Sequence, residues 1–203
     1  MDSSELQALR HRLGAWEQIS DQIPHNHSRA AVAICLAPDE LGHSVLMMRR
    51  VEHPNDPWSG QISLPGGREE PTDSNLAHTA RRETFEEVGL DLAQEGTRGA
   101  EELGLLPPIQ ARSRSGWMDT TIVPFVHLLR SRPGTTPGPE ATETFWLPLV
   151  QVLSGELEGS FAYTKQDGSV VQLPCWDFDG RRIWGLTFRI VSELVFPARR
   201  DAD

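Results

Sequence analysis

A tight glycine turn followed by an uninterrupted helical segment is the feature that most constrains the fold of this chain. Residues 65–67 read Pro-Gly-Gly, and residues 74–88 contain neither proline nor glycine. Asp73 or Ser74 is a suitable N-cap, and Gly89 stands where a C-terminal cap is expected. The sequence therefore predicts a helix that begins close to a sharp backbone turn.

The predicted helix has two different faces. At 100° per residue, Glu83, Glu86 and Glu87 fall within one arc of roughly 100°. The roughly opposite face collects the smaller and apolar side chains, which are Ala77, Ala80, Thr84, Phe85 and Val88. We therefore expect one face to pack against the protein and the other to present carboxylates.

The carboxylate face opposes the stability of an isolated helix. Glu83 and Glu87 are like charges at i,i+4, which costs ~0.2–0.5 kcal/mol, and all three glutamates lie near the negative end of the helix dipole. For a single Glu-Glu pair, a solvated acidic surface is the better interpretation. Here the adjacent glycine turn favours a metal–phosphate site, and oxygen ligands without nearby cysteine or histidine favour Mg²⁺ or Mn²⁺ over Zn²⁺. Arg82, four residues before Glu86, is placed to orient that carboxylate.

At these residues the chain resembles the Nudix hydrolase family, whose box is written G-x5-E-x7-R-E-U-x-E-E-x-G-U, with U an aliphatic residue. The matching positions are Gly67, Arg82, Glu83, Glu86, Glu87, Gly89 and Leu90. The interval between Gly67 and Arg82 is one residue longer than in the general box, and Thr84 replaces an aliphatic residue. The form P-G-G-x5-D followed by T-A-x-R-E, which includes Asp73, is similar to the coenzyme A pyrophosphatase branch of the family.

Segments on both sides of the box extend this resemblance over most of the chain. They are residues 46–49 (LMMR) and 60–67 (GQISLPGG) upstream and residues 184–189 (WGLTFR) downstream. Two features depart from the substrate signature of the branch: Asp56 stands where a second arginine is expected, and the interval from Arg49 to Gly60 is too long. The resemblance to the branch, in spite of these departures, places coenzyme A or its acyl derivatives first among the substrates that it implies, ahead of sugar nucleotides, dinucleotides and ADP-ribose.

The resemblance implies an α+β fold, a Nudix-like α/β/α sandwich with a mixed central sheet. It implies hydrolysis of a pyrophosphate bond in a small-molecule nucleotide, with metal ligands from Glu83, Glu86, Glu87 and the Gly66 carbonyl. Glu83 is the first candidate for a base acting through water. The candidates for contact with substrate phosphates are Arg49, Arg50, Arg68 and Gly67, although surface charge explains each arginine about equally well.

Composition limits the classes of function. The length of 203 residues, with 38% hydrophobic content, favours a single domain over residues 1–203. A net charge of −10 argues against a nucleic-acid-binding surface. The longest apolar run, residues 30–37, is too short for a membrane span, and the acidic residues 1–5 do not resemble a signal peptide. We expect a soluble, cytoplasmic protein with buried free thiols at Cys35 and Cys175.

The remaining pattern predicts alternating strands and helices. Residues 1–24 predict an N-terminal helix ended by Pro24, which could contribute to a homodimer, and residues 185–197 predict a C-terminal helix. Residues 29–36 and 44–48 predict neighbouring strands. The further predicted strands are residues 102–106, 121–129, 162–164 and 170–173, the last two forming a hairpin.

Several loops carry candidate functional side chains. Residues 53–60 bring Trp58 near the glycine turn, where it stacks on a substrate ring or covers the core. A loop containing Arg112, Arg114 and Trp117 is either a substrate lid or a basic surface loop. Glu140 or Glu143 could supply a further ligand or a base, whereas the histidines at positions 25 and 27 are better explained as surface residues.

A rival function of another class is a non-catalytic module that keeps the fold and binds a nucleotide. Such a module is expected to lose its carboxylates, whereas all three helix glutamates and the glycine turn are present here. The sequence therefore favours catalysis.

Overall fold

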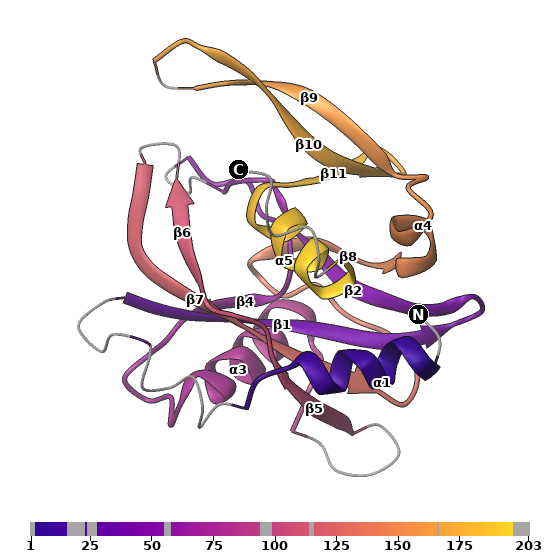
Figure 1. Cartoon of the computed structure of the whole chain (residues 1–203). Helices are drawn as coiled ribbons and strands as arrows, with labels where there is room; N and C mark the ends of the chain where they lie inside the picture. The colour runs from indigo at the N-terminus through magenta and orange to yellow at the C-terminus, as the bar shows by residue number, and fades with distance from the viewer. Residues whose placement is uncertain are drawn as a thin grey trace.

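The computed structural model describes residues 3–15, 23, 28–54, 58–93, 99–113, 116–165 and 167–196 (Figure 1). In chain order the elements are α1 (Ser3–Arg12), β1 (Ser28–Asp39), β2 (Gly42–Arg50), β3 (Ile62–Ser63), β4 (Gly66–Arg68), α3 (Leu76–Val88), β5 (Ala100–Leu105), β6 (Ile109–Ser113), β7 (Gly116–Leu129), β8 (Ala141–Pro148), α4 (Leu149–Leu153), β9 (Glu158–Thr164), β10 (Val170–Phe178), β11 (Arg181–Trp184) and α5 (Gly185–Val195).

Strand β1 lies at the centre of an eight-stranded mixed sheet. It runs parallel to β7 and antiparallel to β2 and β4. The strand path is β3-β2-β1-β7-β5, and β8, β6 and β4 pair with β2, β7 and β1 respectively. Because β1 is covered on both faces, its sequence is a continuous apolar run and does not alternate with polar residues. The predicted pairing of the strands at residues 29–36 and 44–48 is confirmed, with Leu36 opposite Val45.

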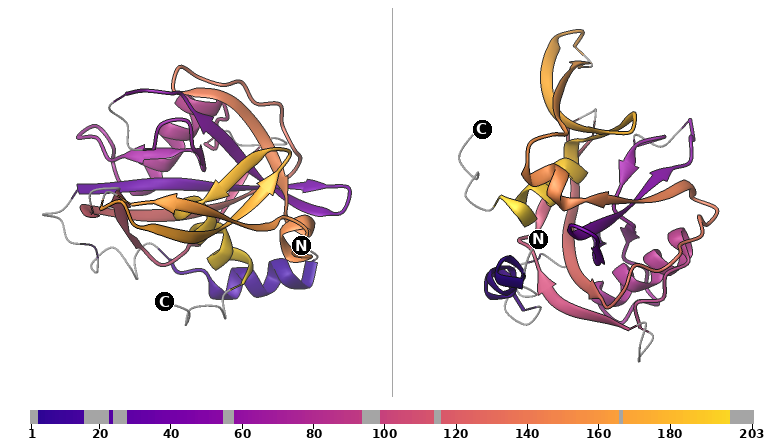
Figure 2. Two further views of the ribbon diagram at one scale, coloured as in Figure 1. Left: turned by 90° about the horizontal axis from the view of Figure 1, so that it is seen from above. Right: turned by 90° about the vertical axis from the view of Figure 1, so that its right-hand side faces the viewer.

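Helices cover both faces of this sheet. Along β1, Ala33 and Cys35 belong to the buried cluster that contains the apolar face of α3, whereas Ile34 and Leu36 belong to the cluster that contains residues of α1 and α5. Alternate side chains of a strand point to opposite faces, so one strand contributes to both clusters. The small side chains on the α3 side allow that helix to lie close to the sheet. The predicted α+β sandwich is confirmed, and Figure 2 shows the layers.

A second, three-stranded antiparallel sheet is formed by β9, β10 and β11. Trp176 and Ile183 are buried in the same core cluster as α5. The β9–β10 hairpin, which projects from the body in Figures 1 and 2, confirms the predicted hairpin. Asp179 and Gly180 both have positive φ, 51° and 74°, as expected for the tight turn between β10 and β11.

Two predicted elements differ from the structure. Helix α1 ends at Arg12, because the backbone of Gly14 exchanges two hydrogen bonds of 3.0 Å with Leu105 and joins the sheet; most of the predicted helix beyond it, with Pro24, lies outside the described residues. The expected loop around Arg112 and Trp117 is a hairpin of β6 and β7, in which these residues are paired. Arg114 and the histidines at 25 and 27 are not described. Helix α5 is confirmed and ends at Val195.

The two cysteines are free and buried, as the sequence predicts. In the described part of the chain, no helix combines the length and the apolar character needed to cross a membrane.

Candidate active site

The glycine turn brings β4 against both β1 and α3. Gly66 has a φ of 151°, and a Cβ atom there would lie 2.4 Å from the carbonyl oxygen of Ala31. A Cβ atom on Gly67 would lie 2.4 Å from Oε1 of Glu83. At Gly66 only glycine therefore allows the backbone to approach the sheet this closely, whereas a side chain at residue 67 would displace the Glu83 carboxylate.

Both ends of helix α3 are capped. The side chain of Asn75 accepts a hydrogen bond of 2.9 Å from the backbone N–H of His78, so the N-cap is Asn75, and the predicted caps Asp73 and Ser74 are wrong by one or two residues. Gly89 adopts the left-handed conformation predicted for the C-cap. Thus a sequence in which several neighbouring residues can cap does not by itself specify which one does.

A loop after β7 also caps this helix. The backbone N–H groups of Thr136 and Gly138 donate to the carbonyl oxygens of Val88 and Glu87, at 3.0 and 2.8 Å. These contacts place Glu140, which follows in the chain, at the cavity next to the helix glutamates. A late acidic residue therefore reaches the box helix through backbone hydrogen bonds.

Asp73 binds Arg82 with two hydrogen bonds of 3.0 Å. The Arg82 hydrogen bond holds the pKa of the Asp73 carboxyl well below its usual range, even though burial opposes this. Arg82 also donates to Glu83 and Glu86, both at 3.0 Å, and to the carbonyl oxygen of Arg68 at 3.1 Å. Arg82 is therefore fixed by Asp73 and in turn orients two glutamates of the helix.

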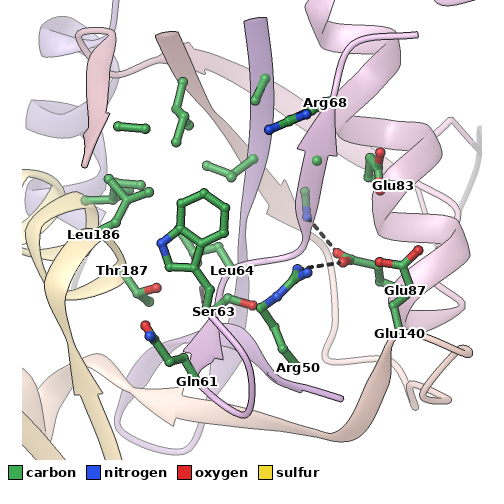
Figure 3. Close-up of a pocket in the computed structure, with 18 of the residues that line it drawn as sticks. Arg50, Gln61, Ser63, Leu64, Arg68, Glu83, Glu87, Glu140, Leu186 and Thr187 are labelled. Atoms are coloured by element: carbon green, nitrogen blue, oxygen red, sulfur yellow. Dashed lines mark hydrogen bonds and ion pairs between the residues drawn. The ribbon is translucent and has the colours of Figure 1, made fainter. Parts of the chain in front are cut away.

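Glu87 is an almost fully buried carboxylate, with 2% of its surface exposed. The Gly66 N–H donates to its Oε2 at 2.8 Å, and Nη1 of Arg50 lies 3.6 Å from its Oε1 (Figure 3). Burial raises the pKa of Glu87 to about 8 in spite of these contacts. Burial also raises the pKa of Glu83, against the opposing effect of Arg82. These two carboxylates are therefore only partly compensated by the protein itself.

The three helix glutamates do not converge on one point. Glu86 is half-exposed and held by Arg82, and it does not line the cavity. Among the described residues, no three acidic, histidine or cysteine side chains are grouped closely enough to hold a metal ion by themselves.

The sequence places Phe85 on the packed face of helix α3, but in the structure its side chain is exposed. The sheet covers a narrower part of the helix surface than the apolar pattern suggests.

A cavity of about 460 Å³ opens beside Glu83, Glu87 and Glu140. Its wall is formed by Ala30, Val32, Arg50, Trp58, Gln61, Ile62, Ser63, Leu64, Gly66, Gly67, Arg68, Ala111, Thr120, Ile122, Leu186, Thr187 and Ile190. Figure 3 shows the carboxylates at one side and Gln61, Leu186 and Thr187 at the other. The cavity therefore has an acidic side and an opposite side that combines apolar side chains with the polar side chains of Gln61 and Thr187.

The predicted substrate residues divide into two groups. Arg50, Arg68 and Gly67 line the cavity. Arg49 does not: its Nε lies 2.7 Å from Oε1 of Glu143, which also binds Arg181. Of the two late acidic candidates, the structure thus brings Glu140 to the cavity and leaves Glu143 in an ion-pair cluster.

Sequence reasoning missed the wall opposite the carboxylates as part of the site. Gln61 and Ser63 precede the glycine turn, and Leu186 and Thr187 begin α5. Both pairs fall in the segments 60–67 and 184–189, which carry the family resemblance. That resemblance is the sequence feature that could have identified them as part of the site. Their meeting depends on tertiary structure, since the two segments are more than a hundred residues apart.

The donor groups present fit a hard divalent cation. Mg²⁺ keeps several waters and is commonly bound by one or two carboxylates together with substrate phosphates, so it does not need a complete cage of protein ligands. Glu83 and Glu87 supply two such carboxylates, and Glu140 lies on the same side of the cavity. A bound cation would also relieve the cost of keeping Glu87 ionised in a buried position.

Comparison with known proteins identifies the family. Residues 27–166 match the NUDIX domain model. The chain is 31% identical over 142 residues to mouse mitochondrial coenzyme A diphosphatase NUDT8, covering 67% of this chain and 61% of that protein. It is 29% identical over 199 residues to the uncharacterized Nudix hydrolase NudL of Salmonella heidelberg, covering 96% of each chain.

A solved structure also resembles this one. It is the NUDIX domain of Shewanella oneidensis NrtR complexed with ADP ribose, at 20% identity and a TM-score of 0.48, over 70% of this chain and 88% of that chain.

The chain belongs to the NUDIX domain family. Family and relatives also confirm the class of enzyme that the sequence predicts, a Nudix pyrophosphohydrolase acting on nucleoside diphosphate derivatives.

Proposed function

We propose that this protein uses Mg²⁺ or Mn²⁺ to hydrolyse the diphosphate linkage of coenzyme A or an acyl-coenzyme A. The observation that carries this proposal is the pair formed by the buried Glu87 and the partly buried Glu83, which faces a cavity beside a glycine turn. Buried carboxylates whose pKa values are raised are costly for a fold, and they are expected where a ligand or a reaction uses them.

The reaction consumes one water molecule. Its oxygen bonds to one phosphorus atom, the bond from that phosphorus to the bridging oxygen breaks, and two monophosphate esters leave. The proton lost by the water passes to a base, for which Glu83 is the first candidate. When bound, the cation neutralises phosphate oxygens and lowers the pKa of water.

The remaining side chains position the diphosphate. Glu83 and Glu87 would hold the cation, with the Gly66 carbonyl and Glu140 as additional candidates; Glu86 is better explained as a partner of Arg82 in this conformation. Arg50 and Arg68 face the cavity and supply positive charge for phosphate oxygens. Gly67 allows a phosphate to approach the backbone closely.

Support for coenzyme A comes from the resemblance to that branch and from the name of the mouse relative. The cavity volume of about 460 Å³ falls in the range of small-molecule sites. Sugar nucleotides, dinucleotides and ADP-ribose are the alternative substrates, because the acidic side of the cavity contacts only the diphosphate that they share. A non-catalytic nucleotide-binding module is disfavoured because both cavity carboxylates of the helix are retained. A cytoplasmic location and a homodimer stay predictions.

The test is a substrate panel with the purified full chain. Coenzyme A, acetyl-coenzyme A, ADP-ribose, a UDP-sugar and a diadenosine polyphosphate are each incubated with Mg²⁺, with Mn²⁺ and with a chelator, and the monophosphate products are quantified. We expect metal-dependent release of adenosine 3′,5′-bisphosphate and 4′-phosphopantetheine from coenzyme A at the highest kcat/KM. Faster cleavage of another compound would replace the substrate, and no cleavage of any diphosphate would contradict the proposed function.

A further inference from the structure

Strand β9 forms an open edge of the smaller sheet. The strand order of that sheet is β11-β10-β9, and among the described residues β9 pairs only with β10. Figure 1 shows the β9–β10 hairpin projecting away from the main sheet. An edge strand presents backbone N–H and C=O groups that can pair with another chain, so β9 is a candidate interaction surface.

The hydrogen bonds of the hairpin show which residues of β9 face outward. The backbone N–H of Lys165, directly after β9, donates to the carbonyl oxygen of Ser169 at 2.8 Å. Bonding to the partner alternates along an antiparallel strand, so the odd-numbered residues of β9 are the ones bonded to β10. The backbone groups of Ser160, Ala162 and Thr164 are therefore directed at the outer edge, and all three residues are exposed.

The opposite edge of the same hairpin is protected against pairing, whereas β9 is not. On β10, Pro174 lies opposite Ser160, and proline has no N–H to offer to a further strand. Residues 159–164 (GSFAYT) contain neither proline nor a charged side chain, although the chain has a net charge of −10. Edge strands usually carry such residues because they prevent pairing between molecules. The composition of β9 therefore favours pairing with a further strand.

Aromatic side chains lie beside this open edge. Phe161 and Tyr163 of β9 pack against Trp184 of β11, with ring centroids 5.1 and 5.3 Å from that of Trp184. Arg182 lies over the Phe161 ring, 4.5 Å from its centroid. Ile183, between Arg182 and Trp184, is buried in the core, so the rings lie on the opposite face of the sheet. Both rings of β9 are only half-buried.

We propose that β9 pairs antiparallel with β9 of a second copy of this chain, which joins the two smaller sheets. A two-fold axis at Ala162 places that residue opposite its own counterpart and places Ser160 opposite Thr164 of the other copy. All three outward-facing residues then bond across the axis, with about six hydrogen bonds in total. The same register places Phe161 opposite Tyr163, so the aromatic face continues from one copy to the other.

The charges and the packing of the chain favour this contact for a homodimer. Because residues 159–164 are uncharged, the pairing brings no like charges opposite each other. Helix α1, which the sequence also offers for a homodimer, has Leu9 fully buried in the core of its own chain. Leu6 and Leu13 pack against the same cluster, so the apolar face of α1 is already covered.

The size of the contact indicates a weak, reversible dimer. The four half-buried rings of two copies would bury roughly 300–500 Å² more, if each contributes about half of its usual area. Together with the backbone edges, this lies near the lower limit of about 1,000 Å² for specific interfaces. We therefore expect a dissociation constant in the micromolar range. The proposal is independent of the proposed function, because no residue of β9 lines the cavity.

Sedimentation velocity of the full chain, at protein concentrations from about 1 to 300 µM, tests the pairing. Ala162→Pro removes an outward-facing N–H, and Ala162→Lys places two lysines opposite each other at the axis. Gln172 lies directly opposite Ala162 on β10. Gln172→Pro and Gln172→Lys therefore make the same changes at the other edge of the same hairpin and serve as matched controls.

We expect a concentration-dependent dimer for the wild type, and a dissociation constant raised at least about tenfold by Ala162→Pro and by Ala162→Lys. The Gln172 variants should stay within about twofold of the wild type. Ala162→Glu should also weaken the dimer, whereas an equimolar mixture of Ala162→Lys and Ala162→Glu should dimerise at least as tightly as the wild type, because opposite charges then meet at the axis. Circular dichroism and thermal unfolding confirm that each variant is folded.

Four results would overturn the proposal. A wild-type chain that stays monomeric over the whole range rejects the dimer. A dimer that no Ala162 variant weakens assigns the contact to another surface. Equal weakening by the Gln172 variants attributes the effect to the stability of the hairpin. A mixture of the lysine and glutamate variants that stays monomeric contradicts the two-fold axis at Ala162.

Discussion

The carboxyl groups of Glu143 and Glu87 have pKa values that are shifted in opposite directions. Burial alone would raise the pKa of Glu143, but hydrogen bonds from Arg181 and Arg49 outweigh it and hold that pKa below its usual value. Burial raises the pKa of Glu87 to about 8, and the contact with Arg50, at 3.6 Å, is too weak to reverse this. The negative charge of Glu143 is thus balanced by two arginines, whereas that of Glu87 is balanced only in part.

The difference separates structure from function. The Glu143 cluster joins β2, β8 and β11, and Arg181 also lies over the ring of Phe145, which stacks on Phe178. It holds the two sheets together and does not line the cavity. The Glu87 environment is unfavourable for the ionised carboxylate, and either a proton or a bound cation would relieve that cost. Uncompensated charge beside a cavity is therefore the better indicator of a site than charge alone.

The largest expected effect is that of Glu87→Gln. Loss of a carboxylate needed for the cation should lower kcat/KM by about 10³-fold or more. The same change should stabilise the metal-free protein at pH 8. The folded pKa of Glu87, about 8, lies above its reference value of 4.5, so its contribution to stability is present at acidic pH and is lost as the pH rises between these values.

Denaturant unfolding in a chelator at pH 5 and pH 8 measures this effect. Glu87→Gln stays neutral, so it should exceed the wild type by about 1–3 kcal/mol at pH 8 and by little at pH 5. Glu156→Gln, which removes an exposed carboxylate outside the cavity, should match the wild type in both assays. A Glu87→Gln variant that is active, or that is less stable than the wild type at pH 8, would contradict the functional role assigned to Glu87.

A smaller effect is expected for Asp73→Asn. This variant tests whether Asp73, whose charge is balanced by Arg82, helps to position the glutamates of the helix. This substitution removes the charge that fixes Arg82, and Arg82 orients Glu83 and Glu86. Because Asp73 acts through another residue, kcat/KM and metal affinity should fall about 10–100-fold. Metal titration followed by fluorescence measures the affinity separately from turnover. The exposed turn variant Asp167→Asn is the control, and unchanged metal binding in Asp73→Asn would show that Arg82 is fixed without it.

The sequence predicts local structure in this molecule better than it predicts tertiary contacts between distant segments. The box helix, its Gly89 cap, the pairing of β1 with β2 and the β9–β10 hairpin all depend on neighbouring residues, and they are confirmed. The length of α1 could not be predicted, because Gly14 pairs with Leu105 and tertiary hydrogen bonds compete with the helix.

The site divides along the same line. The helix pattern identifies Glu83 and Glu87, yet angular spacing alone also groups Glu86 with them, since it does not show that Arg82 binds Glu86 at the exposed surface. Likewise, Arg49 and Arg50 are adjacent in sequence, but neighbouring side chains of a strand point to opposite faces. One meets Glu143 and the other meets Glu87.

The smallest effect is expected for Glu143→Gln, compared directly with Glu140→Gln. Glu143 is partly exposed and paired, so its loss should lower the free energy of unfolding by only about 0.5–1.5 kcal/mol and change kcat/KM less than about threefold. Glu140 lines the cavity, so Glu140→Gln should reduce turnover about tenfold or more and leave stability nearly unchanged. Urea unfolding and initial rates on the same preparations separate the two quantities. If Glu143→Gln instead reduced turnover and Glu140→Gln instead lowered stability, pairing with arginine would not distinguish a structural carboxylate from a functional one.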